Sequence, residues 1–172
     1  MKRIMSAIPL LAVLLLSHAA LAKGPTSKLT IQGAGLRSPI EITNAAQLAH
    51  FGVWTGPGVS INGIADWNPS FADWKQRAFP YQTQDLPRYE VSFYAKKVDE
   101  RVVYTVTYAY DPKSAAGFIY IPAEGQAPYR TNVLSIRRGV EGNWFRASSA
   151  WDNLLGPLLE KASRRNLPTA SP

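Results

Sequence analysis

Residues 88–112, RYEVSFYAKKVDERVVYTVTYAYDP, constrain the fold more than any other segment, because apolar and polar side chains alternate along them. An alternation of period two places successive side chains on opposite faces of a strand. The apolar side chains of the two halves are Tyr89, Val91, Phe93 and Ala95, then Val102, Tyr104, Val106, Tyr108 and Tyr110. The pattern therefore predicts two long antiparallel strands that share one apolar face.

The two apolar faces coincide only if the turn between the strands contains an even number of residues. A two-residue turn at 99–100 and a four-residue turn at 98–101 both satisfy this condition. In this register Phe93 lies opposite Val106. The other face is then expected to face solvent, and it carries Glu90, Ser92, Lys96, Thr105 and Thr107.

The tyrosines of the second strand form either a ligand platform or part of the core, and the end of the chain favours the core. Apolar residues recur there at helical spacing, at Trp151, Leu154, Leu155, Leu158, Leu159 and Ala162. This predicted helix needs an apolar surface to cover, and the tyrosine face is the best surface that the sequence offers. We expect Ser149 and Asp152 to cap its start, and Pro157 to kink or interrupt it.

Shorter patterns complete the sheet. Strand patterns bounded by turn residues occur at 28–43 as a hairpin, at 118–122 as a strand, and at 132–139 with 143–148 as a further hairpin. After the first hairpin we expect a short helix, capped by Thr43 or Asn44 and closed by Gly52 in a left-handed conformation.

Residues 52–88 are rich in Pro, Gly and Trp, which indicates a long loop pinned by its own aromatic side chains. We expect one short helix inside it, with Asn68 as cap, Pro69 in the first turn and SFADWKQ as body. Loops of this length usually have a function. The sequence thus predicts one α+β domain: a mostly antiparallel sheet of about five to six strands, a C-terminal helix packed on one face, and this loop.

The loop supplies the first candidate site, formed by Trp54, Trp67, Trp74, Asp66 and Asp73. Sugar C–H groups stack on aromatic rings, and carboxylates bind hydroxyls or act as acids and bases. The alternative is that the aspartates cap a helix and the tryptophans anchor the loop to the sheet.

A second candidate is a basic cluster near the last strands, made of Arg130, Arg137, Arg138 and Arg146 with Trp144. Such a mixture of cations and rings is typical of surfaces that bind nucleic acids or other anionic polymers. The alternative is an ordinary solvated strand face.

Composition excludes several kinds of chemistry. The chain has no Cys, and His50 is the only histidine beyond residue 22. Thiol catalysis and a zinc site built from several Cys or His ligands are therefore excluded. A catalytic triad would need His50, for which a surface position is the alternative. The sequence contains no nucleophile elbow, phosphate-binding loop or dinucleotide fingerprint, so we expect no cofactor and no metal, and we favour a non-enzymatic role.

The N-terminus has the features of a secretory signal peptide. Basic residues at 2–3 precede an apolar stretch at 10–16, and Ala20-Leu21-Ala22 is a small-residue cleavage motif. The apolar stretch is shorter than the roughly 20 residues of a spanning helix. We expect a cleaved segment at 1–22, one globular domain at 23–165 without a membrane span, a disordered tail at 166–172, and a periplasmic or secreted location.

Five segments resemble, in this order and after a signal peptide, a group of exported bacterial proteins of unknown function. They are LTIQGAGLRSPIEIT, LPRYEVSFYAKK, VVYTVTYAYDP, GFIYIP and GVEGNWFRASSAWDNLLGPLLEKA. The resemblance implies a single exported domain, and it carries no catalytic or binding residues.

Together these observations favour an exported, non-enzymatic protein that binds a ligand or an envelope component. Removing Lys2 and Arg3 with the predicted signal peptide leaves 17 basic and 12 acidic side chains, a formal +5 that weakly favours anionic surfaces without identifying a partner. The basic cluster and the candidate loop site make an anionic envelope polymer or a glycan the candidate partner, and export argues against nucleic acid. One alternative is a glycan-acting hydrolase that uses the carboxylates of residues 52–88, which requires two carboxyl groups roughly 5 to 9 Å apart. The other is a structural or partner-interaction protein, which predicts an exposed apolar patch or sheet edge and no pocket.

Overall fold

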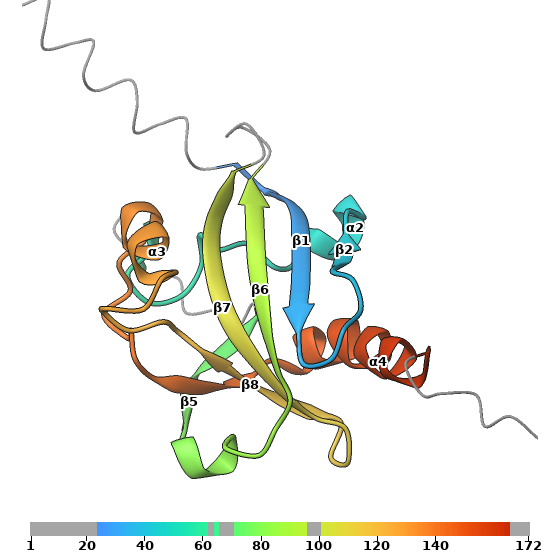
Figure 1. The fold of residues 1–172 in the computed structure, drawn as a ribbon. Helices are drawn as coiled ribbons and strands as arrows, with labels where there is room; N and C mark the ends of the chain where they lie inside the picture. Colours follow the sequence, from blue (N-terminus) through green and yellow to red (C-terminus); the bar gives the residue numbers. More distant parts are fainter. Residues whose placement is uncertain (1–23, 62–63, 66–70, 96–100, 166–172) are drawn as a thin grey trace, which may run out of the picture.

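The computed structural model describes residues 24–61, 64–65, 71–95 and 101–165. Its main element is a seven-stranded antiparallel sheet with the strand order β2-β1-β6-β7-β8-β9-β5 (Figure 1). The strands are β1 (Thr26–Gly33), β2 (Ile40–Ile42), β5 (Ala72–Ala78), β6 (Arg88–Ala95), β7 (Val102–Asp111), β8 (Ala116–Tyr120) and β9 (Trp144–Ala147). The helices are α2 (Ala45–Leu48), α3 (Tyr129–Ser135), α4 (Ser149–Arg165) and the 3₁₀ helix η1 (Pro80–Gln82). The short strands β3 (Ser60–Ile61) and β4 (Ile64–Ala65) pair only with each other. The predicted α+β class is confirmed, with more strands than expected.

The alternating segment forms β6 and β7 as predicted, but the register between them differs by two residues. Phe93 lies opposite Tyr104 rather than Val106, and a bulge follows between Phe93 and Tyr94. A shift of two residues leaves every side chain on its own face, so the alternation alone does not distinguish these registers. The predicted turn falls largely on residues 96–100, outside the described residues.

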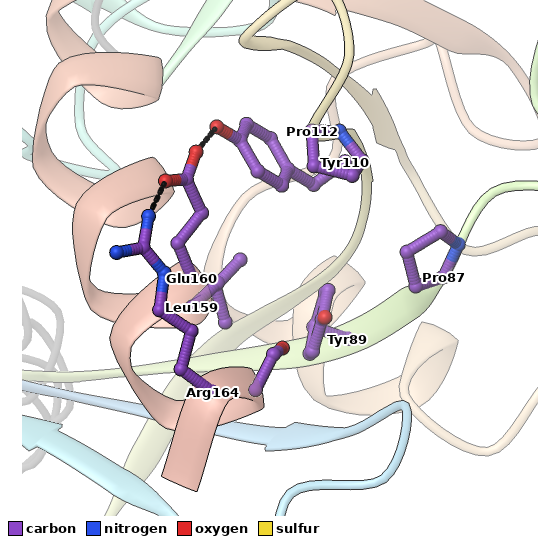
Figure 2. A pocket seen from close by; sticks show the side chains of 8 residues that line it. Pro87, Tyr89, Tyr110, Pro112, Leu159, Glu160 and Arg164 are labelled. Carbon is purple, nitrogen blue, oxygen red and sulfur yellow. Dashed lines mark hydrogen bonds and ion pairs between the residues drawn. The ribbon is translucent and has the colours of Figure 1, made fainter. Parts of the chain in front are cut away.

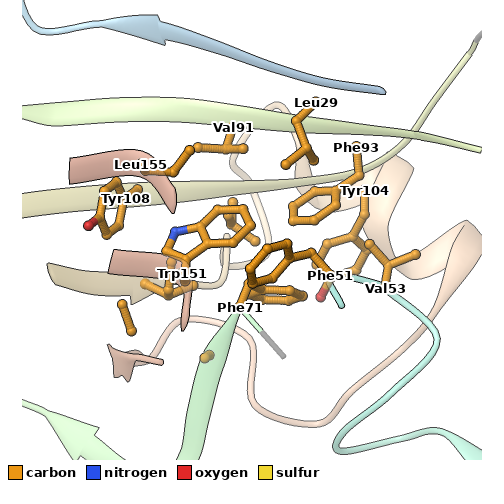
Figure 3. Close-up of a cluster of buried hydrophobic side chains, with 14 of the residues drawn as sticks. Leu29, Phe51, Val53, Phe71, Val91, Phe93, Tyr104, Tyr108, Trp151 and Leu155 are labelled. Carbon is orange, nitrogen blue, oxygen red and sulfur yellow. The ribbon is translucent and has the colours of Figure 1, made fainter. Parts of the chain in front are cut away.

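The tyrosine face of β7 lies in the core, which confirms that prediction (Figure 3). Trp151 of α4 stacks on Phe93 with ring centroids 5.7 Å apart and meets the ring of Tyr108 edge-on at 6.3 Å. The hydroxyl of Tyr108 donates a 2.7 Å hydrogen bond to Asp152 of the same helix. Helix α4 therefore covers this face through both apolar and polar contacts.

The caps of α2 and α4 were predicted with mixed success. Asn44 caps α2, because its Oδ1 accepts the N–H groups of Ala46 and Gln47 at 3.0 and 3.2 Å. Gly52 does not have the expected positive φ angle. At α4 the cap is Ser148, whose Oγ accepts the Trp151 N–H at 3.1 Å, and not the predicted pair of Ser149 and Asp152. The helix is continuous through Pro157.

The predicted helix at SFADWKQ is wrong, because most of this segment belongs to β5 at the edge of the sheet. Ala72 and Trp74 are buried there while Lys75 is exposed, and β5 pairs with β9. Burial of alternate side chains against the core outweighs the helix-start signal of Asn68 and Pro69, which lie outside the described residues.

The predicted strand at 132–139 is also wrong, because α3 occupies its first half. The side chain of Asn132 accepts the Thr105 N–H at 2.8 Å and donates to the Thr105 carbonyl at 2.7 Å. Continuing the register of β8 would bring Pro122 opposite Thr105, and proline has no N–H to donate. The Asn132 amide therefore replaces the missing strand. Thr105 and Ser92, expected to face solvent, are buried.

Within the part of the chain that the structure describes, no helix is long and apolar enough to cross a membrane. The predicted signal peptide at 1–22 and the predicted tail at 166–172 lie outside that part and stay predictions.

Candidate functional site

The two described tryptophans of the first candidate site anchor their segment to the rest of the fold. Trp74 is buried, with its ring centroid 5.3 Å from those of both Phe71 and Phe145. Trp54 is half-buried, and its indole N–H donates to the Gly24 carbonyl at 2.8 Å. Trp67 lies outside the described residues. The described rings thus adopt the anchoring role that was the alternative to a ligand site.

Asp73 has a local structural role. Its Oδ1 accepts the Lys75 N–H at 3.1 Å, and its Oδ2 accepts a hydrogen bond from Gln76 Nε2 at 2.9 Å. Both carboxylate oxygens therefore accept hydrogen bonds from residues two and three positions further along the chain. Asp66 lies outside the described residues, so the separation that a pair of catalytic carboxylates would need stays untested.

Arg138 corrects the predicted basic surface, because its side chain is only 4% exposed. Its Nε donates to the Tyr104 hydroxyl at 2.9 Å, and Nη1 donates to the carbonyls of Thr55 and Pro57 at 2.8 and 3.3 Å. Nη2 donates to the carbonyl of Val53. Burial lowers the pKa of the guanidinium, and Tyr104 opposes that shift. Arg138 therefore links residues 53–57 to β7 through hydrogen bonds, and it does not form part of a basic surface.

The other three arginines of the cluster lie on α3, in the segment after it and on β9. Arg130 on α3 and Arg137 are exposed. Arg146 on β9 is half-buried, and its guanidinium carbon lies 5.1 Å from the ring centroid of Phe118. Of the predicted cluster, Arg146 and Trp144 lie on the same strand and share the face of the sheet that is opposite the core.

This outer face is organised by strand register, because directly paired residues point to the same side of a sheet. One row of paired residues runs across four strands as Glu90, Thr107, Tyr120 and Trp144. The neighbouring row runs across five strands as Arg88, Ala109, Phe118, Arg146 and Asp73. Aromatic rings and charged groups from distant segments of the chain are thereby brought side by side.

A groove with a volume of about 710 Å³ lies on this face, and we call it the outer groove. Its floor includes Arg88, Glu90, Thr107, Tyr120 and Trp144, and its walls include residues 126–128 before α3 and Pro80 of η1. The volume is within the range of about 300 to 1,000 Å³ that is usual for ligand sites.

Several contacts orient the side chains of the outer groove. The guanidinium carbon of Arg88 lies 5.6 Å from the ring centroid of Trp144, and the rings of Trp144 and Tyr120 lie 5.1 Å apart. Gln32 Nε2 donates to Glu90 Oε1 at 2.8 Å. Among the described residues, no carboxylate lies within ion-pair distance of Arg88. The groove therefore presents an unneutralised cation next to an oriented carboxylate.

A smaller cavity of about 340 Å³ lies between α4 and the core face of β6 and β7 (Figure 2). Tyr110 donates to Glu160 Oε1 at 3.0 Å, and Arg164 Nη2 lies 3.6 Å from Glu160 Oε2 (Figure 2). Burial first, and then the hydrogen bond to Glu160, raise the pKa of Tyr110 to about 12. Because these polar groups bind one another, the smaller cavity is a weaker candidate than the outer groove.

Sequence reasoning named Trp144 and Arg146 but missed the outer groove. The available signal was the second set of alternating residues, since Arg88, Glu90 and Thr107 occupy the positions between the core residues. This set was assigned to solvent because the sequence did not show which strands would lie beside it.

The described part of the chain contains no group of three or more His, Asp or Glu side chains that could hold a metal ion. His50 is exposed after the end of α2. Comparisons with protein-family models, with curated proteins and with solved structures find no match.

Proposed function

We propose that this protein is an exported, non-enzymatic binding domain, and that a ligand or a component of the cell envelope occupies the outer groove. One observation carries the proposal: the sheet places a cation, a carboxylate and two aromatic rings side by side along the floor of an open groove. Rings supply contact area and polar groups orient the bound molecule, which are the two requirements of a binding site.

The contacts within the groove floor support this proposal. The floor is built on paired strands, Gln32 donates a hydrogen bond to Glu90, and the guanidinium of Arg88 lies over the ring of Trp144. Side chains that are already ordered lose less conformational entropy on binding, so more of the contact energy appears as affinity.

A non-enzymatic role is part of the proposal because of the number and state of the carboxylates. Among the described residues, Glu90 is the only acidic one that lines the outer groove, whereas hydrolysis of a glycan ordinarily uses two carboxyl groups. The rival hydrolase would need Asp73, and both oxygens of Asp73 accept hydrogen bonds from its own turn.

An exposed aromatic pair favours a second candidate function, that of a partner-interaction protein. The rings of Phe79 and Tyr81 stack at 5.7 Å, and these residues are 59% and 70% exposed. Exposed aromatic side chains frequently dominate the binding energy of protein interfaces.

Co-sedimentation with isolated bacterial cell-envelope material tests the proposed function. The protein is produced from Lys23 onwards, as wild type, as the groove variants Arg88→Gln and Tyr120→Ala, and as the control Arg37→Gln. Arg37 is an exposed arginine in the turn between β1 and β2. We expect the wild type and the control to be retained with the envelope material. The groove variants should bind it at least about tenfold more weakly.

Four outcomes would contradict parts of this proposal. No retention of the wild type would exclude envelope binding, and equal retention of all variants would exclude the outer groove. Loss of retention in a Phe79→Ala/Tyr81→Ala variant, with the groove variants unaffected, would favour the partner-interaction function. Release of soluble sugar that disappears in Asp73→Asn would favour the hydrolase.

A further inference from the structure

The charge of the outer groove indicates the kind of ligand that it accepts. Arg88 is exposed, its guanidinium lies over the Trp144 ring, and no described carboxylate lies within ion-pair distance of it. A guanidinium stacked on a ring keeps the N–H groups of its edge available, and these groups fit the two oxygens of an acidic group. The groove therefore contains a site for one anionic group of a ligand.

The row beside Arg88 supplies a different set of contacts. Tyr120 is half-buried, so part of its side chain is accessible, while its paired neighbour Trp144 is only 8% exposed. An accessible phenol ring next to a covered indole offers one flat apolar surface of limited size, which matches the C–H face of a sugar ring. A sugar on Tyr120 would lie beside Thr107, its paired neighbour in the row.

Glu90 completes the pattern because its carboxylate can only accept hydrogen bonds when ionised. It lies opposite Thr107 in the register and is held by Gln32 Nε2 at 2.8 Å. A carboxylate in this position suits the hydroxyl groups of a sugar, which are donors. The same carboxylate would repel a second acidic group, so the order of Arg88 and Glu90 along β6 would orient the ligand.

We infer that the outer groove binds a glycan that carries acidic groups, with an acidic group on Arg88, a sugar ring on Tyr120 and sugar hydroxyls on Glu90 and Thr107. This inference rests on the proposed function and deepens it. A proline-rich peptide is the competing occupant, because such peptides bind in grooves lined by aromatic rings, and Tyr120 and Trp144 line this one. Such a peptide needs several exposed rings with apolar troughs between them, whereas here polar side chains occupy the floor on one side of Tyr120.

The test uses the protein that begins at Lys23 and titrates it with four probes. Calorimetry and the amide NMR signals of β6, β7 and β8 measure the binding. The probes are an oligogalacturonate, its fully methyl-esterified form, a phosphorylated mannose oligosaccharide and a proline-rich peptide. The esterified form has the same sugars without the charge, so it isolates the contribution of the acidic group. The phosphorylated probe distinguishes a carboxylate from a phosphate as the source of that charge.

We expect at least one acidic oligosaccharide to bind at least about tenfold more tightly than the neutral ester. Its binding should weaken as salt is added. Arg88→Gln should remove this preference and leave the affinity for the ester unchanged. Tyr120→Ala should weaken binding of both forms, and Arg37→Gln should change neither.

Equal affinity for the acidic and neutral forms would overturn the inference, as would binding of the peptide alone. Envelope retention that depends on the groove, combined with no binding of any oligosaccharide, would overturn this inference and leave the proposed function standing. Failure of both experiments would remove the proposed function as well.

Discussion

At the scale of single residues, Arg138 shows how a side chain that the sequence marks as a surface cation can belong to the interior. It is buried, and it bonds the Tyr104 hydroxyl and three carbonyls of residues 53–57. Its guanidinium carbon also lies 4.9 Å from the ring centroids of both Tyr104 and Trp74. A cation that fulfils this role must be an arginine, because only its planar fork reaches acceptors in several directions.

Replacing Arg138 is therefore expected to destabilise the protein strongly. Arg138→Met leaves the three carbonyls and the Tyr104 hydroxyl without their donor, and we expect the free energy of unfolding to fall by about 3 kcal/mol or more. Arg138→Lys should lose nearly as much, because one ammonium group cannot reach all four acceptors. Urea unfolding followed by tryptophan fluorescence measures both values.

The neighbouring Arg137 provides the matched control. It is exposed, so Arg137→Met should change the free energy of unfolding by no more than about 0.5 kcal/mol. Similar losses in the Arg137 and Arg138 variants would show that the buried hydrogen bonds contribute little.

Tyr110 leads to a prediction about alkaline pH. Its pKa is raised from 10.0 to about 12, first by burial and then by its hydrogen bond to Glu160. A phenol with a higher pKa in the folded than in the unfolded state stabilises the fold fully below pH 10.0 and loses this effect as the pH rises towards about 12. Tyr110→Phe cannot ionise, so its stability should decline less steeply across this window than that of the wild type.

Urea unfolding followed by circular dichroism across this pH window tests the prediction. Burial also raises the pKa values of Tyr89, Tyr104 and Tyr108, so both proteins should lose some stability. The informative quantity is the difference between the two slopes, and parallel slopes would contradict the assignment to Tyr110.

At the scale of elements, α3 and β8 both form hydrogen bonds with the backbone of β7 along the same edge of that strand. Strand β8 pairs with residues 107–111, and the Asn132 side chain takes over at Thr105. Asn132→Leu keeps the branched arrangement of four side-chain heavy atoms but leaves the Thr105 N–H and carbonyl without partners, which should lower the free energy of unfolding by about 2 to 4 kcal/mol. The Thr105 amide should also exchange its hydrogen much faster with solvent, as measured by NMR.

Leu134 is the control for this prediction because it lies on the same helix and is 78% exposed. Leu134→Ala should change the free energy of unfolding by no more than about 0.5 kcal/mol and leave exchange at Thr105 unaltered. Slow exchange of the Thr105 amide in Asn132→Leu would mean that another group protects this position.

Strands β6 and β7 show how much of the fold the sequence could predict. Strands β6 and β7 were identified because a period of two extends over many residues in each. The register between them could not be predicted in this way. Tyr104 and Val106 lie on the same face of β7, so the alternation is equally consistent with Phe93 opposite either of them. Alternation determines faces, and the details of the turn determine register.

Segments whose structure depends on distant partners were the ones predicted wrongly. SFADWKQ carries a helix-start signal, yet Trp74 forms part of β5 because Phe71 and Phe145 provide a buried site for its ring. Asn132 was placed in a strand because no local pattern shows that its amide would pair with Thr105. The outer groove was missed for the same reason, since its residues meet only after several strands have paired.

At the scale of the whole molecule, the two faces of the sheet differ in chemistry although the same strands build both. The core face buries aromatic and aliphatic side chains against α4, and the outer face displays rings next to charges. Because successive residues point to opposite faces, the substitutions proposed for the outer groove leave the core residues in place. Binding and stability can therefore be measured separately in this protein.

The start of the domain gives the last prediction. The Gly24 carbonyl accepts the indole N–H of Trp54 at 2.8 Å, and the Thr26 hydroxyl donates to the Phe51 carbonyl at 2.9 Å. Cleavage after Ala22, as the signal motif predicts, preserves both bonds. A chain begun at Ser27 loses them, and its free energy of unfolding should be lower than that of a chain begun at Lys23 by about 2 kcal/mol.

Two measurements check this prediction. Urea unfolding compares the two chains, and Trp54→Phe in the longer chain separates the contribution of the first bond, about half of the total. The mass of the protein recovered after export gives the natural N-terminus, which should be Lys23. A natural N-terminus beyond Thr26, or equal stability of the two chains, would show that the contacts of Gly24 and Thr26 do not define where the folded domain begins.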